Sequence, residues 1–266
     1  MQIFTKDSSV TLYNASFCET YHNAQDGALQ ETLHKHILPA LSLKMQEPIL
    51  SVLDICFGLG FNTLCLVHTA RSLRFKGKIF IYSPELDFNL LPKLLKHPYP
   101  KELENELTIL ESLVMRHYYK EQDLEIVLYL GNAREILKCF LARDSKDTPH
   151  GIAQNPMRFN IIFQDAFSPL KNRTLWTYEY FKTLYALSSE EVIITTYSHH
   201  SCMLYSAYLA GFYAFKLHQK DVRDSIVLTK NAKLPNMELD NVVNITAINI
   251  AHKIKTNPKL WGLYDV

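Results

Sequence analysis

The stretch SVLDICFGLGFN, from Ser51 to Asn62, constrains the fold of this chain more than any other feature. It begins as a short apolar run that Asp54 interrupts, which is the pattern of a buried parallel strand. Gly58 and Gly60 follow, and a helical pattern opens at Asn62. Glycines let the backbone approach a ligand, and the N–H groups of a helix start attract negative charge, so this order predicts a nucleotide-cofactor site. The alternative is a turn that only packs a helix against a strand end.

The spacing of the glycines distinguishes two kinds of cofactor motif. Thr63 occupies the last glycine position of the dinucleotide motif G-x-G-x-x-G, so that pattern is not met. The looser pattern acid-x-G-x-G-x-G fits better, with Asp54 as the acid and Cys56 in the first glycine place. This resembles the motif of methyltransferases that use S-adenosylmethionine (SAM), and SAM is therefore the expected cofactor.

The composition allows a full globular core and argues against several classes of protein. The chain has 266 residues, 47% of them hydrophobic, and its net charge of +1 indicates neither nucleic acid nor membrane binding. Its start does not resemble a signal peptide, and no apolar run approaches the roughly 20 residues that cross a bilayer. The cysteines form no C-x-x-C pair, which argues against zinc or a disulfide framework and favours the cytoplasm; they are Cys18, Cys56, Cys65, Cys139 and Cys202.

Apolar runs and helical patterns alternate from residue 50 to residue 217, which predicts an open, mostly parallel sheet with helices on both faces. The last two apolar runs are close enough to pair as an antiparallel hairpin. We therefore expect a Rossmann-like α/β fold of the class I SAM-dependent methyltransferase type with a seven-stranded sheet. The strand at 52–55 is followed by strands expected at Lys78–Ser83, Glu125–Leu130, Phe159–Phe163, Glu191–Thr196, Phe212–Leu217 and Asp224–Lys230.

The two ends of the chain are expected to extend this core. Residues 1–48 predict a β-hairpin and a helix, residues 49–235 the SAM-binding domain, and residues 236–266 a terminal helix and tail. His34 and His36 lie two residues apart on the N-terminal helix, so they cannot share a helix face as metal ligands do. We expect both to be solvated or hydrogen-bonded, and we expect no metal. Residues 143–157 predict a surface loop.

Polar residues gather at the carboxyl ends of the predicted strands, where ligands bind in folds of this class. Asp54, Asn132 and Asp165 each stand at such an end, and Glu85 closes the second strand. A carboxylate at the tip of the second strand can accept hydrogen bonds from both ribose hydroxyls. We therefore favour a cofactor role for Glu85 over that of a solvated carboxylate.

The loop QDAFSP, residues 164–169, is the best candidate for the chemistry. An amine must be neutral to accept a methyl group, and a carboxylate can orient the amine and take up its proton. Asp165 suits that role in a loop that Pro169 stiffens, and Phe167 can stack on a planar base or pack against adenine. The alternative is that Asp165 caps the next turn and Phe167 fills the core.

Three segments of the sequence carry a family resemblance. LDICFGLGFN (53–62), DAFSPLKNRTLWT (165–177) and TYS (196–198), which AGF (210–212) follows, resemble the methyltransferase domain of the MnmC family. The N-terminal YHN (21–23) and DG (26–27), with Glu31, also look like the opening segment of that family. The resemblance spans residues 12 to 230, and its most specific part is the block that begins at Asp165.

This resemblance implies an activity on the wobble uridine of tRNA. The reaction would be SAM-dependent N-methylation of 5-aminomethyl-(2-thio)uridine to 5-methylaminomethyl-(2-thio)uridine. We expect a stand-alone methyltransferase without a flavin domain, coupled in function to the enzyme that makes the amine. By position, Asp165 would face the amine. The implied cofactor residues are Asp54, Phe57, Gly58, Gly60, Asn62, Glu85, Asn132 and Ala133, and the candidate substrate residues are Phe167, Pro169, Lys171 and Tyr197.

The chain departs from the family pattern at two places. The family usually has Asp where this chain has Asn132, which can hydrogen-bond an adenine amino group through its amide oxygen but cannot act as a base. The helix after TYS usually carries arginines, whereas this chain reads HHSCMLY (199–205). Phosphate contacts with tRNA would then come from other cations, unless these form an ordinary solvated surface: Lys171, Arg173, Lys216, Lys220 and Arg223.

Other functions fit parts of the same pattern. An aminopropyltransferase of the spermidine-synthase type also deprotonates an amine, but its polycationic substrate favours several acids, and the loop here holds only Asp165. A small-molecule amine N-methyltransferase is a further enzyme reading. An inactive SAM-fold binding module is the non-enzyme alternative, against which the intact Asp54, Gly58, Gly60 and Glu85 argue. SAM binding separates these readings, because an aminopropyltransferase prefers decarboxylated SAM and a scaffold need not bind either.

Overall fold

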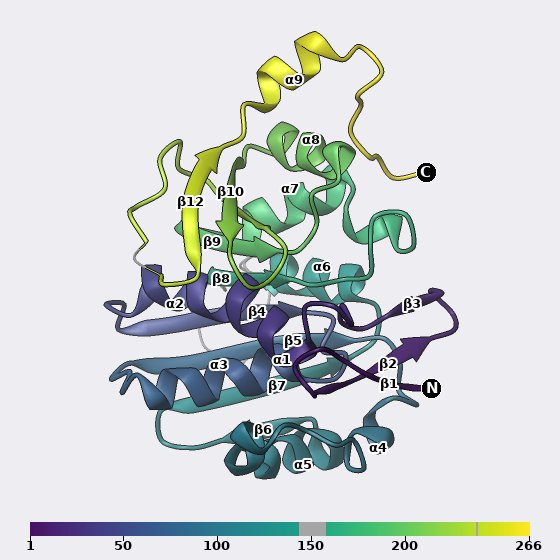
Figure 1. Ribbon diagram of the computed structural model, residues 1–266, viewed down its shortest axis with the longest axis vertical. Helices are drawn as coiled ribbons and strands as arrows, with labels where there is room; N and C mark the ends of the chain where they lie inside the picture. The colour runs from purple at the N-terminus through teal and green to yellow at the C-terminus, as the bar shows by residue number, and fades with distance from the viewer. Residues whose placement is uncertain (144–157, 238) are drawn as a thin grey trace.

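The computed structural model describes residues 1–143, 158–237 and 239–266 (Figure 1). The surface loop predicted at 143–157 lies outside these ranges, apart from its first residue. Within them, one large sheet runs through the middle, in the order β12-β10-β11-β9-β8-β4-β5-β7-β6. Its strands are β4 (Ile49–Ile55), β5 (Lys78–Glu85), β6 (Tyr118–Lys120), β7 (Leu124–Leu130), β8 (Phe159–Gln164), β9 (Ser188–Thr196), β10 (Tyr213–Gln219), β11 (Ser225–Thr229) and β12 (Val242–Ala247).

The pairing of the strands confirms the predicted Rossmann-like fold of class I SAM-dependent methyltransferases. Strands β4, β5, β7, β8 and β9 are parallel, and β11 and β10 complete the sheet as an antiparallel hairpin. The seven predicted strands are all present. Two antiparallel edge strands, β6 and β12, were not predicted, because β6 has three residues and β12 is mostly exposed, so neither shows a buried alternation. The terminal helix expected after residue 236 is present, but β12 precedes it.

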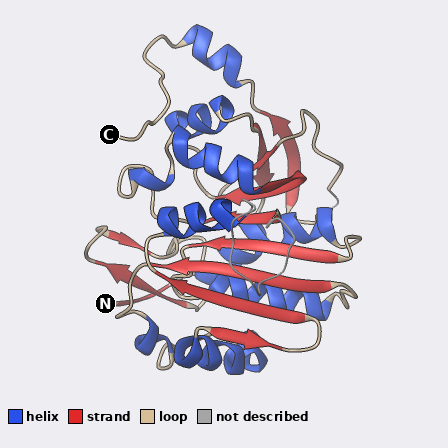
Figure 2. Cartoon of the chain, turned by 180° about the vertical axis from the view of Figure 1, so that it is seen from behind, coloured by secondary structure: helices blue, strands red, loops and turns tan. Residues whose placement is uncertain are grey.

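The helices cover both faces of the sheet, and Figure 2 shows the side that α6, α7 and α8 cover. The opposite side carries the N-terminal helices together with α3 and α5 (Figure 1). Their bounds are α1 (Ala28–Thr32), the π-helical turn η1 (Leu33–Ile37), α2 (Leu38–Lys44), α3 (Phe61–Ser72), α4 (Leu91–Leu94), the 3₁₀ turn η2 (Lys101–Glu106), α5 (Leu107–Arg116), α6 (Ala133–Arg143), the 3₁₀ turn η3 (Arg173–Leu175), α7 (Tyr178–Leu187), α8 (Ser201–Leu209) and α9 (Ile250–Thr256).

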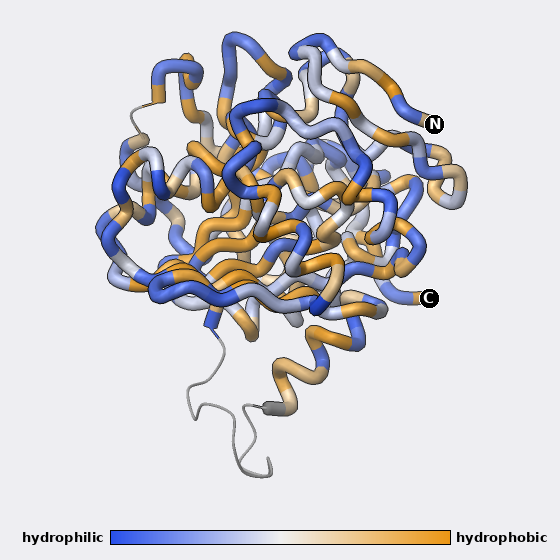
Figure 3. Tube along the Cα trace, turned by 90° about the horizontal axis from the view of Figure 1, so that it is seen from below, coloured by the Kyte–Doolittle hydropathy of each residue, from blue (hydrophilic) through white to orange (hydrophobic). Residues whose placement is uncertain are grey.

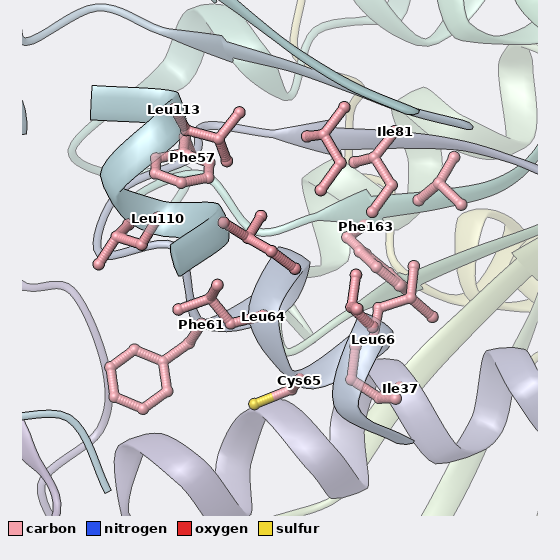
Figure 4. Close-up of a cluster of buried hydrophobic side chains, with 14 of the residues drawn as sticks. Ile37, Phe57, Phe61, Leu64, Cys65, Leu66, Ile81, Leu110, Leu113 and Phe163 are labelled. Carbon is pink, nitrogen blue, oxygen red and sulfur yellow. The ribbon is translucent and has the colours of Figure 1, made fainter. Parts of the chain in front are cut away.

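Among the described residues, two large hydrophobic cores lie on the two faces of the sheet, and a third, small cluster contains Ile193, Leu217 and Val227. Successive strand residues point to opposite faces, so Val52 of β4 joins one core and its neighbour Leu53 joins the other. The first core holds the inner residues of α3 and α5 against β4, β5 and β8, and Figure 4 shows Leu64 and Leu110 within it. The hydrophobic segments accordingly run through the interior in Figure 3. Burial on both faces fixes the positions of the strand ends that form the site.

The N-terminal segment forms a small antiparallel sheet of β1 (Gln2–Phe4), β2 (Val10–Asn14) and β3 (Glu19–Thr20), which confirms the predicted hairpin and adds a third strand. The turn after β1 is joined to the helix that follows. Asp7 accepts a hydrogen bond from the backbone N–H of Gln30 at 2.9 Å. Gly27 has a φ of +91°, and a Cβ there would lie 2.1 Å from Cγ of Asp7. Only glycine therefore allows this contact. The division of the chain at residues 48 and 235 stays a prediction.

The predicted N-terminal helix contains a π-helical turn. The N–H of Leu38 bonds to the carbonyl of Leu33, five residues earlier. Pro39 follows directly, and in a regular α-helix its ring would clash with the carbonyl of Lys35, four residues earlier. The wider turn lets the helix continue past the proline, and turns of this kind are frequent at functional sites.

Lys35, on this π-helical turn, is a buried lysine whose side chain is 2% exposed. Its Nζ donates to Asp26 at 2.6 Å and to Glu31 at 2.9 Å, and Arg223 reaches Asp26 from the loop before β11 at 3.2 Å. Hydrogen bonds from both cations hold the pKa of Asp26 below its ordinary value, although burial opposes them. The cluster fastens the N-terminal helices to the large sheet.

We predict that Lys35→Met lowers the free energy of unfolding by about 3–5 kcal/mol, because Glu31 would remain buried without its cation and Asp26 would keep only Arg223. Urea denaturation of the two proteins measures the difference. Lys138→Met is the control, since Lys138 pairs with Glu135 on the surface, both side chains being more than half exposed, and should cost less than about 1 kcal/mol. Equal losses in the two variants would contradict the role of the buried cluster.

Candidate functional site

The glycine turn between β4 and α3 has an unusual backbone. Gly58 and Gly60 have φ values of +55° and +76°, and Cys56, in the first glycine place of the motif, has a φ of +66°. A Cβ on Gly60 would lie 2.8 Å from the ring of Phe57, which is buried. The helix α3 then begins without a side-chain cap. Its first N–H groups remain available, as the sequence motif predicts.

Glu85 lies at the end of β5 beside this turn, and its side chain is held by the backbone. One carboxylate oxygen accepts the N–H of Gly58 at 2.8 Å, and the other accepts the N–H of Asp87 at 2.7 Å. Burial raises the pKa of Glu85 above its ordinary value, although these two hydrogen bonds oppose it. Each oxygen can accept a second hydrogen bond, so the carboxylate is oriented and still able to bind a hydroxyl.

The end of β7 places Asn132 and Ala133 at the same edge of the sheet. The amide oxygen of Asn132 accepts the N–H of Arg134 at 2.9 Å, so the side chain caps the start of α6. This cap is a structural role that the sequence analysis did not foresee. The contact that we expected between this oxygen and an adenine amino group would have to share the atom with the cap.

Asp165 directly follows β8, and its carboxylate has a partner on each side. One oxygen accepts a hydrogen bond from Nδ2 of Asn62 at 2.9 Å, and the other lies 3.5 Å from Nε2 of His36. Burial favours the neutral acid, but His36, His22 and the Asn62 hydrogen bond outweigh it and hold the pKa of Asp165 below its ordinary value. Asp165 is therefore ionised at neutral pH.

The loop that carries Asp165 is fixed by its neighbours. Tyr197 donates to the carbonyl of Ala166 at 2.9 Å, and the indole N–H of Trp176 donates to the carbonyl of Phe167 at 2.8 Å. The ring of Phe167 stacks on Phe17 from the N-terminal sheet, with ring centroids 4.6 Å apart. Pro169 is buried, whereas Lys171 points to the surface as an exposed residue. Neither of these two lines the cavity described next.

A cavity of about 740 Å³ opens at these strand ends. It brings together seven of the predicted site residues: Gly58, Glu85, Asn132, Ala133, Asp165, Phe167 and Tyr197. Asp54, Phe57, Gly60 and Asn62 are buried and are not among the residues that line it. The predicted clustering at the carboxyl ends of the strands thus holds for the residues that line the cavity. Their individual roles stay predictions.

One wall of the cavity comes from the N-terminal segment, to which the sequence analysis assigned no role in the site. Tyr21 lies over the glycine turn, so that a Cβ on Gly58 would be 3.1 Å from its ring. His22, Glu31 and Lys35 line the cavity as well. The resemblance of residues 21–31 to the opening of the MnmC family was the only sequence signal for this wall.

The cations suggested for phosphate contacts are mostly engaged within the protein. Lys216 pairs with Asp224 at 2.8 Å, and Arg173 donates to the carbonyl of Tyr264 at 3.3 Å. Arg223 is bound to Asp26 but also lines the cavity. Contacts between these cations and tRNA stay a prediction.

The residues present fit SAM. The oriented carboxylate of Glu85 can accept ribose hydroxyls, and the uncapped start of α3 can bind a carboxylate group. Oδ1 of Asn62 is a buried acceptor without a hydrogen-bond partner, which an ammonium group could supply. Over the described residues, neither a metal-binding cluster of acids, histidines and cysteines nor a helix long and apolar enough to span a membrane is found.

Asp54 is the second carboxylate at this edge, and Asn62 joins it to Asp165. Thr63 donates to Asp54 at 2.7 Å, and Nδ2 of Asn62 lies 3.3 Å from its other oxygen. Burial raises the pKa of Asp54 to about 7, and the Asp165 charge adds to this, although the two hydrogen bonds oppose it. Asp54 therefore keeps a proton, at pH values between about 4 and 7, that it loses in the unfolded chain.

We predict that Asp54 makes the protein less stable as the pH rises from about 4 to about 7, because the folded state binds the proton more tightly than the unfolded state over that range. Asp54→Asn removes this titration. The melting temperature of the wild type relative to Asp54→Asn should therefore fall as the pH rises through that window. A difference between the two proteins that does not change with pH would contradict the raised pKa.

Comparison with known proteins supports the same function. Residues 97–222, a little under half of the chain, match the model of a family described as S-adenosyl-L-methionine-dependent methyltransferase. The chain is 28% identical over 201 residues to an uncharacterized protein of Methanocaldococcus jannaschii, covering 73% of this chain and 49% of that relative. It thus spans about half the length of the curated relative that it matches.

The crystal structure of MnmC2 from Aquifex aeolicus is similar over nearly the whole chain. The TM-score is 0.77 at 25% identity, and the match covers 99% of this chain and 78% of that one. The family match, the sheet order and this likeness agree with the site geometry. They show that the chain has the class I fold of SAM-dependent methyltransferases and is similar in structure to MnmC2.

Proposed function

We propose that the protein methylates the amine of 5-aminomethyl-(2-thio)uridine at the wobble position of tRNA, giving 5-methylaminomethyl-(2-thio)uridine. The observation that carries this proposal is the Asp165 carboxylate, which faces the cavity and whose pKa is held below its ordinary value. An ionised carboxylate in a partly enclosed site can bind an amine and accept its proton. Gly58 of the glycine turn and Glu85 line the same cavity, and we propose that the cofactor binds against them.

The proposed role of Asp165 is to prepare the amine for attack. An aminomethyl group is cationic in water, so one N–H bond must break, leaving its electron pair on nitrogen while the proton goes to the carboxylate or to a water that it holds. When bound, SAM supplies a methyl group on a positively charged sulfur, which keeps the electron pair of the broken S–C bond. The nitrogen lone pair forms the new N–C bond, and the hydrogen bonds that fix the 165–169 loop hold the amine in line.

Three observations support tRNA as the substrate. The block 165–177 resembles the MnmC family, and the chain is similar in structure to MnmC2 over 99% of its length. The volume of about 740 Å³ is at the upper part of the range for ligand pockets, which suits a cofactor together with a nucleoside. Phe167 and Tyr21 give the cavity aromatic walls on which a base that has left its stack could pack. A cytoplasmic location and a separate source of the amine remain expectations.

The decisive experiment uses unfractionated tRNA from a strain that lacks this gene and from the intact strain. With labelled SAM, we expect label in a wobble uridine of the first tRNA alone, because the second is already methylated. Asp165→Asn should reduce this transfer by about 10²- to 10⁴-fold, the usual loss for a proton acceptor, and leave SAM affinity within about twofold by calorimetry. Activity that survives in Asp165→Asn would contradict the proposed role of the loop.

Absence of label in both tRNAs, with SAM binding confirmed, would contradict tRNA as the substrate. Small amines would then be assayed with SAM and with decarboxylated SAM. Methyl transfer to a small amine would indicate a small-molecule N-methyltransferase, and aminopropyl transfer would indicate an enzyme of the spermidine-synthase type.

We predict that Glu85→Ala weakens SAM binding by on the order of 1–3 kcal/mol, because a buried charged acceptor for the ribose is lost. Isothermal calorimetry measures the change, and the melting temperature without SAM reports any loosening of the glycine turn that Glu85 also holds. Unchanged affinity would remove Glu85 from the cofactor site.

A further inference from the structure

His36 has an unusual position for a residue of the N-terminal segment. It lies on the π-helical turn η1, its side chain is 1% exposed, and its Nδ1 lies 2.8 Å from Oγ1 of Thr195 on β9. Its Nε2 lies 3.5 Å from a carboxylate oxygen of Asp165 and is buried without a hydrogen-bond partner. The imidazole therefore bridges the end of β9 and the carboxylate that follows β8.

The other groups around Asp165 show what this contact can contribute to its ionisation. Burial favours the neutral form of Asp165. The other titratable groups near it are His22, Cys56 and Tyr197. Burial lowers the pKa of His22, so that this ring is mostly neutral, and raises the pKa values of the Cys56 thiol and the Tyr197 hydroxyl. Of these three, only His22 helps to lower the pKa of Asp165, and it does so less than His36.

The position of His36 beside Asp165 is fixed by the strand pairing and by a hydrogen bond to Thr195. Thr195 stands opposite Phe163 in the parallel pairing of β8 and β9. Phe163 lies two residues before Asp165 in the chain. The Thr195 hydroxyl fixes one ring nitrogen of His36, which leaves the other aimed at the carboxylate. A histidine that only filled the core would need no second polar partner.

We propose that His36 is a positioning residue of the active site, which fixes the Asp165 carboxylate and keeps it ionised to accept the proton of the amine. The inference rests on the proposed amine methylation, since it assigns His36 a part in that step. It makes the N-terminal helix a component of the catalytic machinery rather than a cover for the sheet. His36 acts through Asp165 and does not itself line the cavity.

Asp54 indicates what Asp165 would become without its histidine. Asp54 is buried at the same edge of the sheet, receives hydrogen bonds from neutral side chains only, and has a pKa of about 7. In His36→Gln, the pKa of Asp165 should therefore rise, because burial remains and the His36 ring is lost. A larger fraction of the carboxylate would then be protonated at pH 6 than at pH 8.5.

The first test needs no substrate. The carboxyl carbon of Asp165 is followed by NMR in protein labelled with ¹³C-aspartate, and its signal is identified by its loss in Asp165→Asn. We expect the pKa of Asp165 to rise in His36→Gln and to stay at the wild-type value in His34→Gln. His34 is the matched control, because it lies on the same turn, bonds to Gln30 at 2.9 Å and does not contact Asp165.

The second test is the pH profile of methyl transfer to tRNA. We expect kcat/KM of His36→Gln to fall about tenfold at pH 6 and less than twofold at pH 8.5, with SAM affinity unchanged at both. Thr195→Val, which removes only the partner of Nδ1, should shift the acid limb in the same direction by a smaller amount. This variant keeps the proposal testable if His36→Gln does not fold.

The outcomes separate the two proposals. An unchanged Asp165 titration in His36→Gln would overturn the role of His36, and so would a loss of activity that is equal at all pH values. If the wild type transfers no methyl group to tRNA, the proposed substrate fails. The NMR titration still decides in that case whether His36 holds Asp165 ionised.

Discussion

Two neighbouring carboxylates, Asp54 fully buried and Asp165 16% exposed at the cavity wall, are the constraint on which the rest of this site depends. Asp54 and Asp165 stand at the ends of adjacent parallel strands, and one amide group of Asn62 donates towards both. Two such acids cannot both ionise cheaply away from water. The fold separates their pKa values by giving neutral donors to Asp54 and a histidine to Asp165. When the surroundings of two neighbouring acids make their pKa values differ, the two acids usually have different roles in the chemistry.

The N-terminal segment contributes to this difference in pKa, and several contacts hold it in place. Its helices carry His36 to one side of Asp165, and the small sheet brings Phe17 and Tyr21 against the loop and the glycine turn. The buried Lys35 cluster ties those helices to the loop before β11. The N-terminal segment therefore forms part of the cavity wall, part of the surroundings of Asp165 and part of the contacts that stabilise the fold.

The sequence predicted the parts of the fold that local patterns determine. Strands buried on both faces read as apolar runs, and their ends place Gly58, Glu85 and Asp165 at one edge of the sheet whatever the details of packing. The short or exposed edge strands β6 and β12 have no such pattern. The wall formed by Tyr21 and His22 could not be predicted, because it depends on where a distant segment docks. His36 was expected to be solvated or hydrogen-bonded, and the reasoning stopped there because its spacing from His34 was judged only for a metal site on a regular α-helix.

The π-helical turn sets the rotational phase of the N-terminal helix. One extra residue in a turn rotates everything before it by about 100° relative to everything after it. Before the turn, Ala28 and Gln30 bond to the segment between β1 and β2, and after it α2 packs on β9. A chain one residue shorter here would have to give up one of the two alignments. Insertions and deletions in this segment should consequently be far less tolerated than their position outside the large sheet would suggest, and related sequences of equal length there should be the ones that keep the same active-site environment.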